Sequence, residues 1–213
     1  TAAAARSVSG QADLELRSVQ GQFDEVLYAR VAKHPEVALA SPVLEVATYA
    51  LSNGEKYSLK IVGVDALVVG FVAPDAMPVP NSATNTQPDR FVLFAPNQVF
   101  LNSAAQRLLK LSFDTDTTDL KLQSGAQLMP VQVAGSVRAT GRALAVMDIG
   151  AAQDLFNKHG LLSRVDIRLR PGVNRDAFAS SLQGGADWPL GLNLTPPEQA
   201  QAQIDNLSRA YRV

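Results

Sequence analysis

Histidine and carboxylate side chains are the residues of this sequence that could bind a metal ion, because the chain contains no cysteine. The two histidines, His34 and His159, lie far apart, and neither has a second candidate ligand at metal-binding spacing. Asp114, Asp116 and Asp119 lie close together, but the glycine and the later glutamate of a calcium-binding loop are missing. Each histidine follows a predicted helix, whose dipole favours an imidazole at that end, so we interpret both as structural. The sequence therefore predicts no metal site and no cofactor.

Other residue patterns that support catalysis are also missing. Neither a Gly-x-Ser-x-Gly nucleophile elbow nor a Ser-x-x-Lys pair occurs. Gly70 and the pair Gly184-Gly185 form neither a dinucleotide-binding nor a phosphate-binding loop. We therefore expect that the protein is not an enzyme, and a free-standing enzyme with an unrecognised site is the least favoured hypothesis.

The composition is that of a globular protein, because 46% of the 213 residues are hydrophobic and 18% are charged. The net charge of −1 produces no field that would attract nucleic acid, so we expect no nucleic-acid partner. No run of residues approaches the roughly 18–20 apolar positions that cross a bilayer.

Two segments carry candidate contact residues for a partner or a substrate. Arg164, Arg168 and Arg170 alternate along one predicted strand and therefore share a face. This face is either solvated and balanced by Asp166, or a docking surface for an acidic partner or for lipid headgroups.

The second segment, residues 66–80, is an apolar loop with a single charged residue, Asp75. It either folds back to cover a core or exposes a patch that contacts a partner or an apolar substrate. The loop residue Trp188 is similarly either a core plug or an interface anchor. The candidate contact residues are therefore Leu67, Val69, Phe71, Met77, Trp188, Arg164, Arg168 and Arg170.

The elements that position these residues form two similar β-α-β units, one at each end of the chain. The first contains an alternating strand at 12–17, a helix carrying Phe23, Val26, Leu27 and Val31 that Pro35 ends, and a strand at 43–51. The second contains a strand with Val165, Ile167 and Leu169, a helix with Phe178 and Leu182, and a strand with Leu190, Leu192 and Leu194. We expect both units to share one sheet-and-helix subdomain, formed by residues 1–65 and 161–213.

The middle of the chain, residues 66–160, is predicted to be an inserted, β-rich second subdomain with two helices. Asn53-Gly54 predicts a type I′ hairpin that pairs 43–51 with 57–64 just before it. The remaining predicted elements are a long loop from Asp65 to Arg90, a strand at 91–94, a helix opened by Pro96, a hairpin at 120–137 that turns at Ser124-Gly125, and a strand at 144–149 before a helix that Gly160 ends.

Short segments along nearly the whole chain carry a family resemblance in their order and spacing. They are residues 9–14, 23–25, 35–37, 41–43, 61–65, 133–137, 146–149 with Ala152-Gln153, 165–169 with Pro171-Gly172, and the closing helix from Pro197. Together they resemble the extracytoplasmic (periplasmic) core domain of MacB-like, FtsX-like ABC transporter permeases. The resemblance implies an α+β fold with a porter-like part at both ends of the chain and a smaller inserted part.

The resemblance also implies a location and a role. This domain of the family lies between the first two transmembrane helices of a bacterial inner-membrane permease that dimerises and works with a cytoplasmic ATPase. It would transmit ATP-driven conformational change for export, for lipoprotein or lipid extraction, or for regulation of an envelope partner. The alternative is a module that itself binds a substrate or an envelope protein, lipoprotein or lipid. Thr1–Ala5 would then be the stub of one membrane helix, and residues 197–213 would lead into the next, so we expect an excised domain with adjacent ends.

Overall fold

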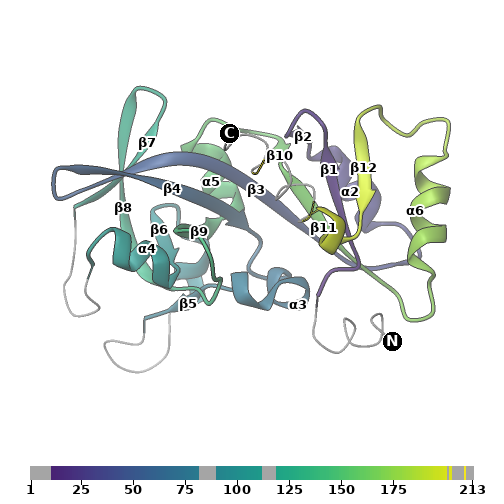
Figure 1. The fold of residues 1–213 in the computed structure, drawn as a ribbon, viewed down its shortest axis with the longest axis horizontal. Helices are drawn as coiled ribbons and strands as arrows, with labels where there is room; N and C mark the ends of the chain where they lie inside the picture. The colour runs from purple at the N-terminus through teal and green to yellow at the C-terminus, as the bar shows by residue number, and fades with distance from the viewer. Residues whose placement is uncertain (1–10, 82–89, 112–118, 201, 203–208, 210–213) are drawn as a thin grey trace.

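The computed structural model describes residues 11–81, 90–111, 119–200, 202 and 209, and shows an elongated α+β protein built on one large mixed sheet (Figure 1). The strands are β1 (Leu14–Ser18), β2 (Phe23–Asp24), β3 (Val37–Ser52), β4 (Glu55–Val64), β5 (Val79–Pro80), β6 (Gln98–Leu101), β7 (Leu120–Ser124), β8 (Gln127–Ser136), β9 (Leu144–Asp148), β10 (Leu161–Leu162), β11 (Arg164–Leu169) and β12 (Leu192–Thr195). The helices are α2 (Val26–Ala32), α3 (Val69–Val72), α4 (Ser103–Leu108), α5 (Ile149–Leu155) and α6 (Arg175–Gln183), with 3-10 turns η1 (Pro74–Ala76) and η2 (Arg90–Phe94). None of the helices in these described ranges is long and apolar enough to cross a bilayer.

The β3–β4 hairpin runs along much of the molecule (Figure 1). Its turn is the predicted one, because Asn53 and Gly54 both have positive φ angles, 51° and 79°, and Ser52 pairs with Glu55. Strand β3 begins at Val37, earlier than predicted, because its first residues pair with β11, which follows more than a hundred positions later. The hairpin therefore reaches from the strands at the chain ends to those of the middle section.

Strands from both ends of the chain lie side by side in the order β12-β1-β11-β3. The apolar side of this part forms one buried cluster with side chains from α2 and α6, including Val31 and Phe178. The predicted first helix was wrong at its start, because Phe23 lies in β2 and pairs with Leu162 of β10. Only Val31 of α2 is buried, so Phe23 reaches the core from a strand rather than from a helical stripe.

The middle section continues the same sheet through β9, β6, β8 and β5, while β7 pairs with both β3 and β8. Two predictions were wrong here, because 91–94 forms η2 rather than a strand, and Pro96 precedes strand β6 rather than a helix. Three of the four β6 residues are buried, so the strand has no alternation to reveal it. Helix α4 begins only after Asn102, whose side-chain oxygen accepts the Ala105 N–H at 2.9 Å.

The other predicted elements of the middle section are present, with shifted ends. The second hairpin turns at Gly125, with Ser124 paired to Gln127. Strand β9 leads into α5, which ends at Leu155, before the predicted Gly160. The division into two subdomains at 66 and 160 stays a prediction, because one continuous sheet joins both parts.

Candidate functional site

The apolar segment 66–80 has two sides, and the two interpretations of the loop apply to different residues. Val69 and Val72 of α3 are 1% and 3% exposed, Val69 belongs to a buried cluster, and Met77 packs against that cluster half-buried. By contrast, Leu67 is 71% exposed and Phe71 is 58% exposed. One side of α3, with Val69 and Val72, is therefore buried, and the other side, with Phe71, stands open to solvent.

Strand β11 has one apolar side and one charged side, as its alternation predicts, but the charged side is not a solvated surface. Asp166 is only 4% exposed, and the Arg164 side chain is 17% exposed. Cross-strand pairing places Glu15 and Ser41 opposite Asp166, and Arg17 opposite Arg164. The prediction of a solvated outer face was therefore wrong for Arg164 and Asp166, because the neighbouring strands enclose them with charges of both signs.

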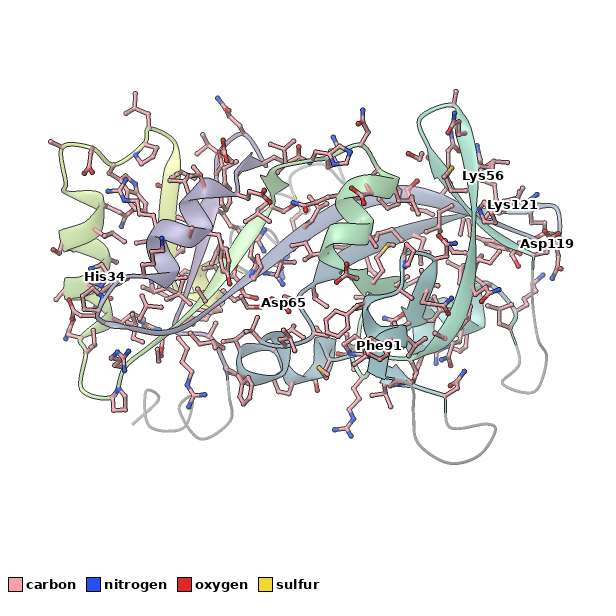
Figure 2. All side chains as sticks on the ribbon, turned by 180° about the vertical axis from the view of Figure 1, so that it is seen from behind. His34, Lys56, Asp65, Phe91, Asp119 and Lys121 are labelled. Atoms are coloured by element: carbon pink, nitrogen blue, oxygen red, sulfur yellow. The ribbon has the colours of Figure 1, made fainter. Side chains whose placement is uncertain are left out.

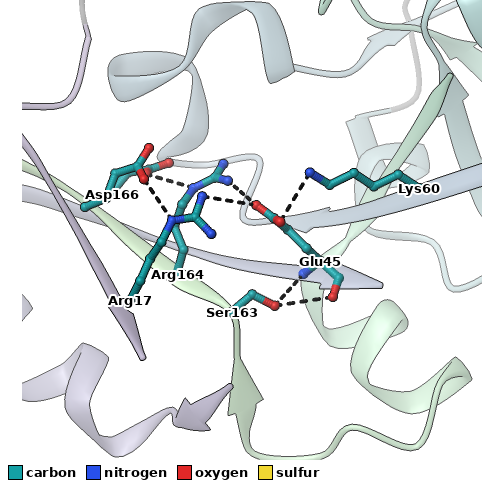
Figure 3. A network of polar contacts seen from close by, with 7 residues as sticks. Arg17, Glu45, Lys60, Ser163, Arg164 and Asp166 are labelled. Carbon is teal, nitrogen blue, oxygen red and sulfur yellow. Dashed lines mark hydrogen bonds and ion pairs between the residues drawn. The ribbon is translucent and has the colours of Figure 1, made fainter. Parts of the chain in front are cut away.

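These side chains form an ionic network centred on Glu45 (Figure 3). Arg164 donates to Glu45 and, through Nε, to Asp166 Oδ1 at 3.0 Å. Glu45 also lies 3.2 Å from Lys60 Nζ and 3.6 Å from a guanidinium nitrogen of Arg17. Its backbone N–H donates to Ser163 Oγ at 2.8 Å. The network therefore connects β1, β11, β3 and β4 near the middle of β3.

The pKa values of this network follow from burial and from its partners. Burial alone would lower the pKa of Arg164, but Asp166, Glu45 and Glu15 raise it above its ordinary value. Burial would raise the pKa of Glu45, yet Arg164, Lys60 and Arg17 hold it below its ordinary value. For Asp166 burial outweighs the attraction of Arg164, so its pKa is raised. Arg164 is therefore a permanent buried cation with two carboxylate partners, which favours a structural role.

A groove of about 510 Å³ brings together residues from the two candidate segments. Phe71 of α3 lines it with Arg168 and Arg170, although the aromatic residue and the arginines are far apart in sequence. Its other lining residues are Asp13, Ala38, Leu39, Leu169, Pro171, Gly172 and Val173. Sequence reasoning missed these residues, because only the pairing of β3 with β11 places Leu39 beside Arg168. The groove thus combines apolar walls with two guanidinium groups.

Polar contacts hold two charged groups of the groove in place. Arg170 Nε donates to the Pro35 carbonyl at 2.7 Å, while Arg170 remains exposed and Arg168 is half-buried. Asp13 is the groove's carboxylate, and its Oδ2 accepts the Leu169 N–H at 2.8 Å. The groove has a net basic character because two guanidinium groups face one carboxylate.

The remaining candidate contact residue, Trp188, lies away from the groove in the cluster between the end strands and α6. Its ring is half-buried against that cluster, and its Nε1 donates to the Leu192 carbonyl at 2.9 Å. The neighbouring Asp187 forms an ion pair with Arg30 at 2.9 Å. These contacts favour the core-plug interpretation of Trp188.

The histidines have local partners that account for their positions. His34 Nδ1 accepts the Glu36 N–H at 3.1 Å, and its ring meets Phe178 edge-on with centroids 5.0 Å apart. His159 lies 3.2 Å from Asp154. In the described part of the chain, no group of three or more histidine, aspartate or glutamate side chains could hold a metal ion. The Asp114–Asp116 segment lies outside the described residues.

The described ends of the chain lie at the same end of two neighbouring strands. Strands β1 and β12 are antiparallel neighbours, and Glu15, near the start of the first, pairs with Thr195, the end of the last. A helix then begins at 197–200, where Glu198 forms an ion pair with Arg175 at 3.1 Å. Thr1–Ala5 and most of the predicted closing helix lie outside the described residues. The chain therefore enters and exits the sheet side by side.

Comparison with solved structures assigns this fold to a class of membrane-transporter domains. The extracellular domain of the ABC-type transporter YknZ from Gram-positive bacteria matches with a TM-score of 0.60 and 13% identity, over 85% of this chain and 98% of that one. The periplasmic region of MacB from Actinobacillus actinomycetemcomitans matches with a TM-score of 0.61 and 10% identity, over 93% and 96% of the two chains.

A domain of a permease protein from Porphyromonas gingivalis matches less closely, with a TM-score of 0.51, 16% identity, and coverage of 86% of this chain and 88% of that one. No protein-family model and no curated protein matches the sequence. The chain thus has the fold of the extracytoplasmic domains of MacB- and YknZ-type ABC transporters, as the resemblance implied.

Proposed function

We propose that this chain is the non-catalytic extracytoplasmic domain of a MacB-like, FtsX-like ABC transporter permease. The observation that carries the proposal is the likeness of fold over 93% of the chain to the periplasmic region of MacB. The pairing of Glu15 with Thr195 supports it, because two membrane helices flanking the domain require adjacent entry and exit points. The domain would lie outside the cytoplasmic membrane, and a cytoplasmic ATPase and a second permease copy would act on it through the membrane region.

Within this class, the geometry favours transmission of a mechanical change. Strand β3 has 16 residues, so it spans about 50 Å at the usual rise of a strand. Its first half pairs with β11, near the chain ends, and its last residues pair with β7. A displacement at the chain ends would therefore be transmitted along one continuous strand to the turn of the β3–β4 hairpin and to the β7–β8 hairpin, which we call the far hairpins.

The Glu45 network strengthens this mechanical path. Glu45 lies near the middle of β3, where the buried cluster beneath the end strands gives way to the cluster of the middle section. Its ion pairs with Arg17, Lys60 and Arg164 hold four strands together at this point. We accordingly infer two subdomains, a porter-like one (1–65 and 161–213) and an inserted one (66–160), which move as a coupled unit because the β3–β4 hairpin of the first pairs with strands of the second.

A second candidate function rests on the groove. Its apolar walls and the guanidinium groups of Arg168 and Arg170 suit a module that recruits an envelope protein, a lipoprotein or a lipid. Such binding is compatible with export, with extraction of lipoproteins or lipids, or with regulation of an envelope partner.

The flanking coding sequence tests the class, because a permease domain requires a transmembrane helix on each side. Spin labelling of the whole permease tests transmission. The chain has no cysteine, so Lys56→Cys places a single label near the far hairpin once any cysteines elsewhere in the permease are replaced. We expect the distance between the labels of two permease copies to change on ATP binding. An unchanged distance during ATP turnover would refute transmission while leaving a binding role open.

A further inference from the structure

Large apolar side chains stand exposed on short elements along one edge of the molecule. Leu67 precedes α3 and Phe71 belongs to it, and both are exposed. Phe91 of η2 is 81% exposed. The inner residues of both elements, such as Val69 and Leu93, pack on a shared buried cluster. Figure 1 shows α3 and Figure 2 shows Phe91 along the same lower edge. The elements are thus anchored inward and present apolar side chains outward.

The basic side chains of the groove adjoin this apolar edge. Phe71 lines the groove together with Arg168 and Arg170, so one aromatic residue belongs to both features. The nearby Asp65 is half-buried and its carboxylate accepts the Leu67 N–H at 2.9 Å, whereas Asp75 of η1 is exposed. Exposed apolar side chains beside arginines are the combination found on proteins that lie in a membrane interface.

This surface lies where the chain enters the sheet. Asp13, which lines the groove, is two positions from the first described residue and just precedes β1. Strand β12 ends beside the start of β1, so both connections to the membrane proposed above would leave from this end. The surface would therefore face the bilayer if the proposed function is correct, and the inference rests on that function.

We propose that Leu67, Phe71, Arg168 and Arg170 form a contact surface for the outer leaflet of a bilayer that contains anionic phospholipids. The two apolar side chains would insert at the level of the upper acyl chains. The two guanidinium groups would donate to lipid phosphates, for which their planar donors are suited. The contact would hold the porter-like end of the domain at a fixed height above the membrane.

The combination of exposed apolar side chains with arginines favours a bilayer over an acidic protein. Leu67 is 71% exposed and Phe71 is 58% exposed, and of the two arginines Arg170 is exposed and Arg168 is half-buried in the groove. Phosphates lie above acyl chains in a leaflet, so a bilayer offers partners for the arginines and for the exposed apolar side chains at once. An acidic protein would match the charge but would leave the projecting leucine and phenylalanine without a defined apolar site.

Vesicle sedimentation with this chain tests the proposal. The chain is mixed with vesicles of phosphatidylcholine alone or of phosphatidylcholine with an equal amount of phosphatidylglycerol. We expect binding to the anionic vesicles that falls about 25-fold in the double variant Arg168→Gln/Arg170→Gln, at roughly fivefold for each arginine near the surface. Leu67→Ser/Phe71→Ser should reduce binding at least tenfold on both kinds of vesicle.

The matched control is Lys56→Gln/Lys121→Gln, which removes the same charge from the far hairpins, away from the proposed surface (Figure 2). We expect this control to change binding less than twofold, and unchanged thermal melting to show that each variant is folded. No binding to anionic vesicles, equal binding to both vesicle types, or equal losses in variant and control would overturn the proposal. Retention of the chain on an immobilised acidic polypeptide without vesicle binding would overturn it in favour of a protein partner. The spin-label experiment on the whole permease tests the proposed function separately, so its outcome does not depend on vesicle binding.

Discussion

Replacing Arg164 by methionine tests whether the Glu45 network is a structural junction. Methionine keeps much of the apolar volume but removes the guanidinium, which leaves Asp166 buried without its main partner. Glu45 would keep Lys60 and Arg17. Removing one partner of a buried ion pair costs about 3–5 kcal/mol, and we expect the free energy of unfolding to fall by that amount at pH 7.

The pKa of Asp166 determines how the cost of Arg164→Met changes with pH. In the native protein Arg164 lowers the pKa of Asp166 against the stronger effect of burial, so its removal raises that pKa further. A carboxyl group whose pKa is raised in the folded state gains stability by binding a proton, and this contribution is lost as the pH rises. The cost of Arg164→Met should therefore be largest at neutral pH and should shrink as the pH falls and Asp166 becomes protonated.

Urea unfolding followed by circular dichroism at pH 5 and pH 7 measures both effects. The double variant Arg164→Met/Asp166→Asn should recover most of the loss, because no unpaired buried charge remains. Arg175→Met is the matched control, because its ion pair with Glu198 is more exposed and should contribute less than about 1 kcal/mol. A cost below about 1 kcal/mol at pH 7, or an identical cost at both pH values, would refute the reasoning.

Three further predictions concern packing and assembly. Ser41 is fully buried and its Oγ has no hydrogen-bond partner, so Ser41→Ala should leave stability unchanged or raise it by about 1 kcal/mol in urea unfolding; a clear loss would mean that the hydroxyl is satisfied. A Cβ atom on Gly135 would lie 2.0 Å from the Val79 carbonyl oxygen, so Gly135→Ala should separate β5 from β8 and lower the melting temperature by several degrees, whereas an unaltered melting curve would contradict this packing. The isolated chain should be monomeric at micromolar concentration in light scattering, because a stable dimer needs roughly 1,000 Å² of complementary surface and the exposed apolar residues of segment 66–80 belong to short elements; a dimer peak would contradict this.

The sequence by itself determined the elements that depend on neighbouring residues. Asn53-Gly54 specified the hairpin between β3 and β4, because both residues tolerate the positive φ angles of its turn. The alternation of Val165, Ile167 and Leu169 with charged residues specified β11, because successive side chains of a strand point to opposite faces. These patterns depend on residues a few positions apart, so they predict an element without knowledge of the rest of the fold.

Tertiary structure alone decided which residues meet and which side of a strand is covered. Arg164 had the pattern of a solvent-facing residue, yet neighbouring strands enclose it, because charges of opposite sign on β1 and β3 compensate its burial. Strand β6 was missed because a strand buried on both faces has no alternation. Phe71 and Arg168 share one groove only because α3 packs against the β3–β11 pair, and contacts between distant segments depend on the fold as a whole rather than on local spacing.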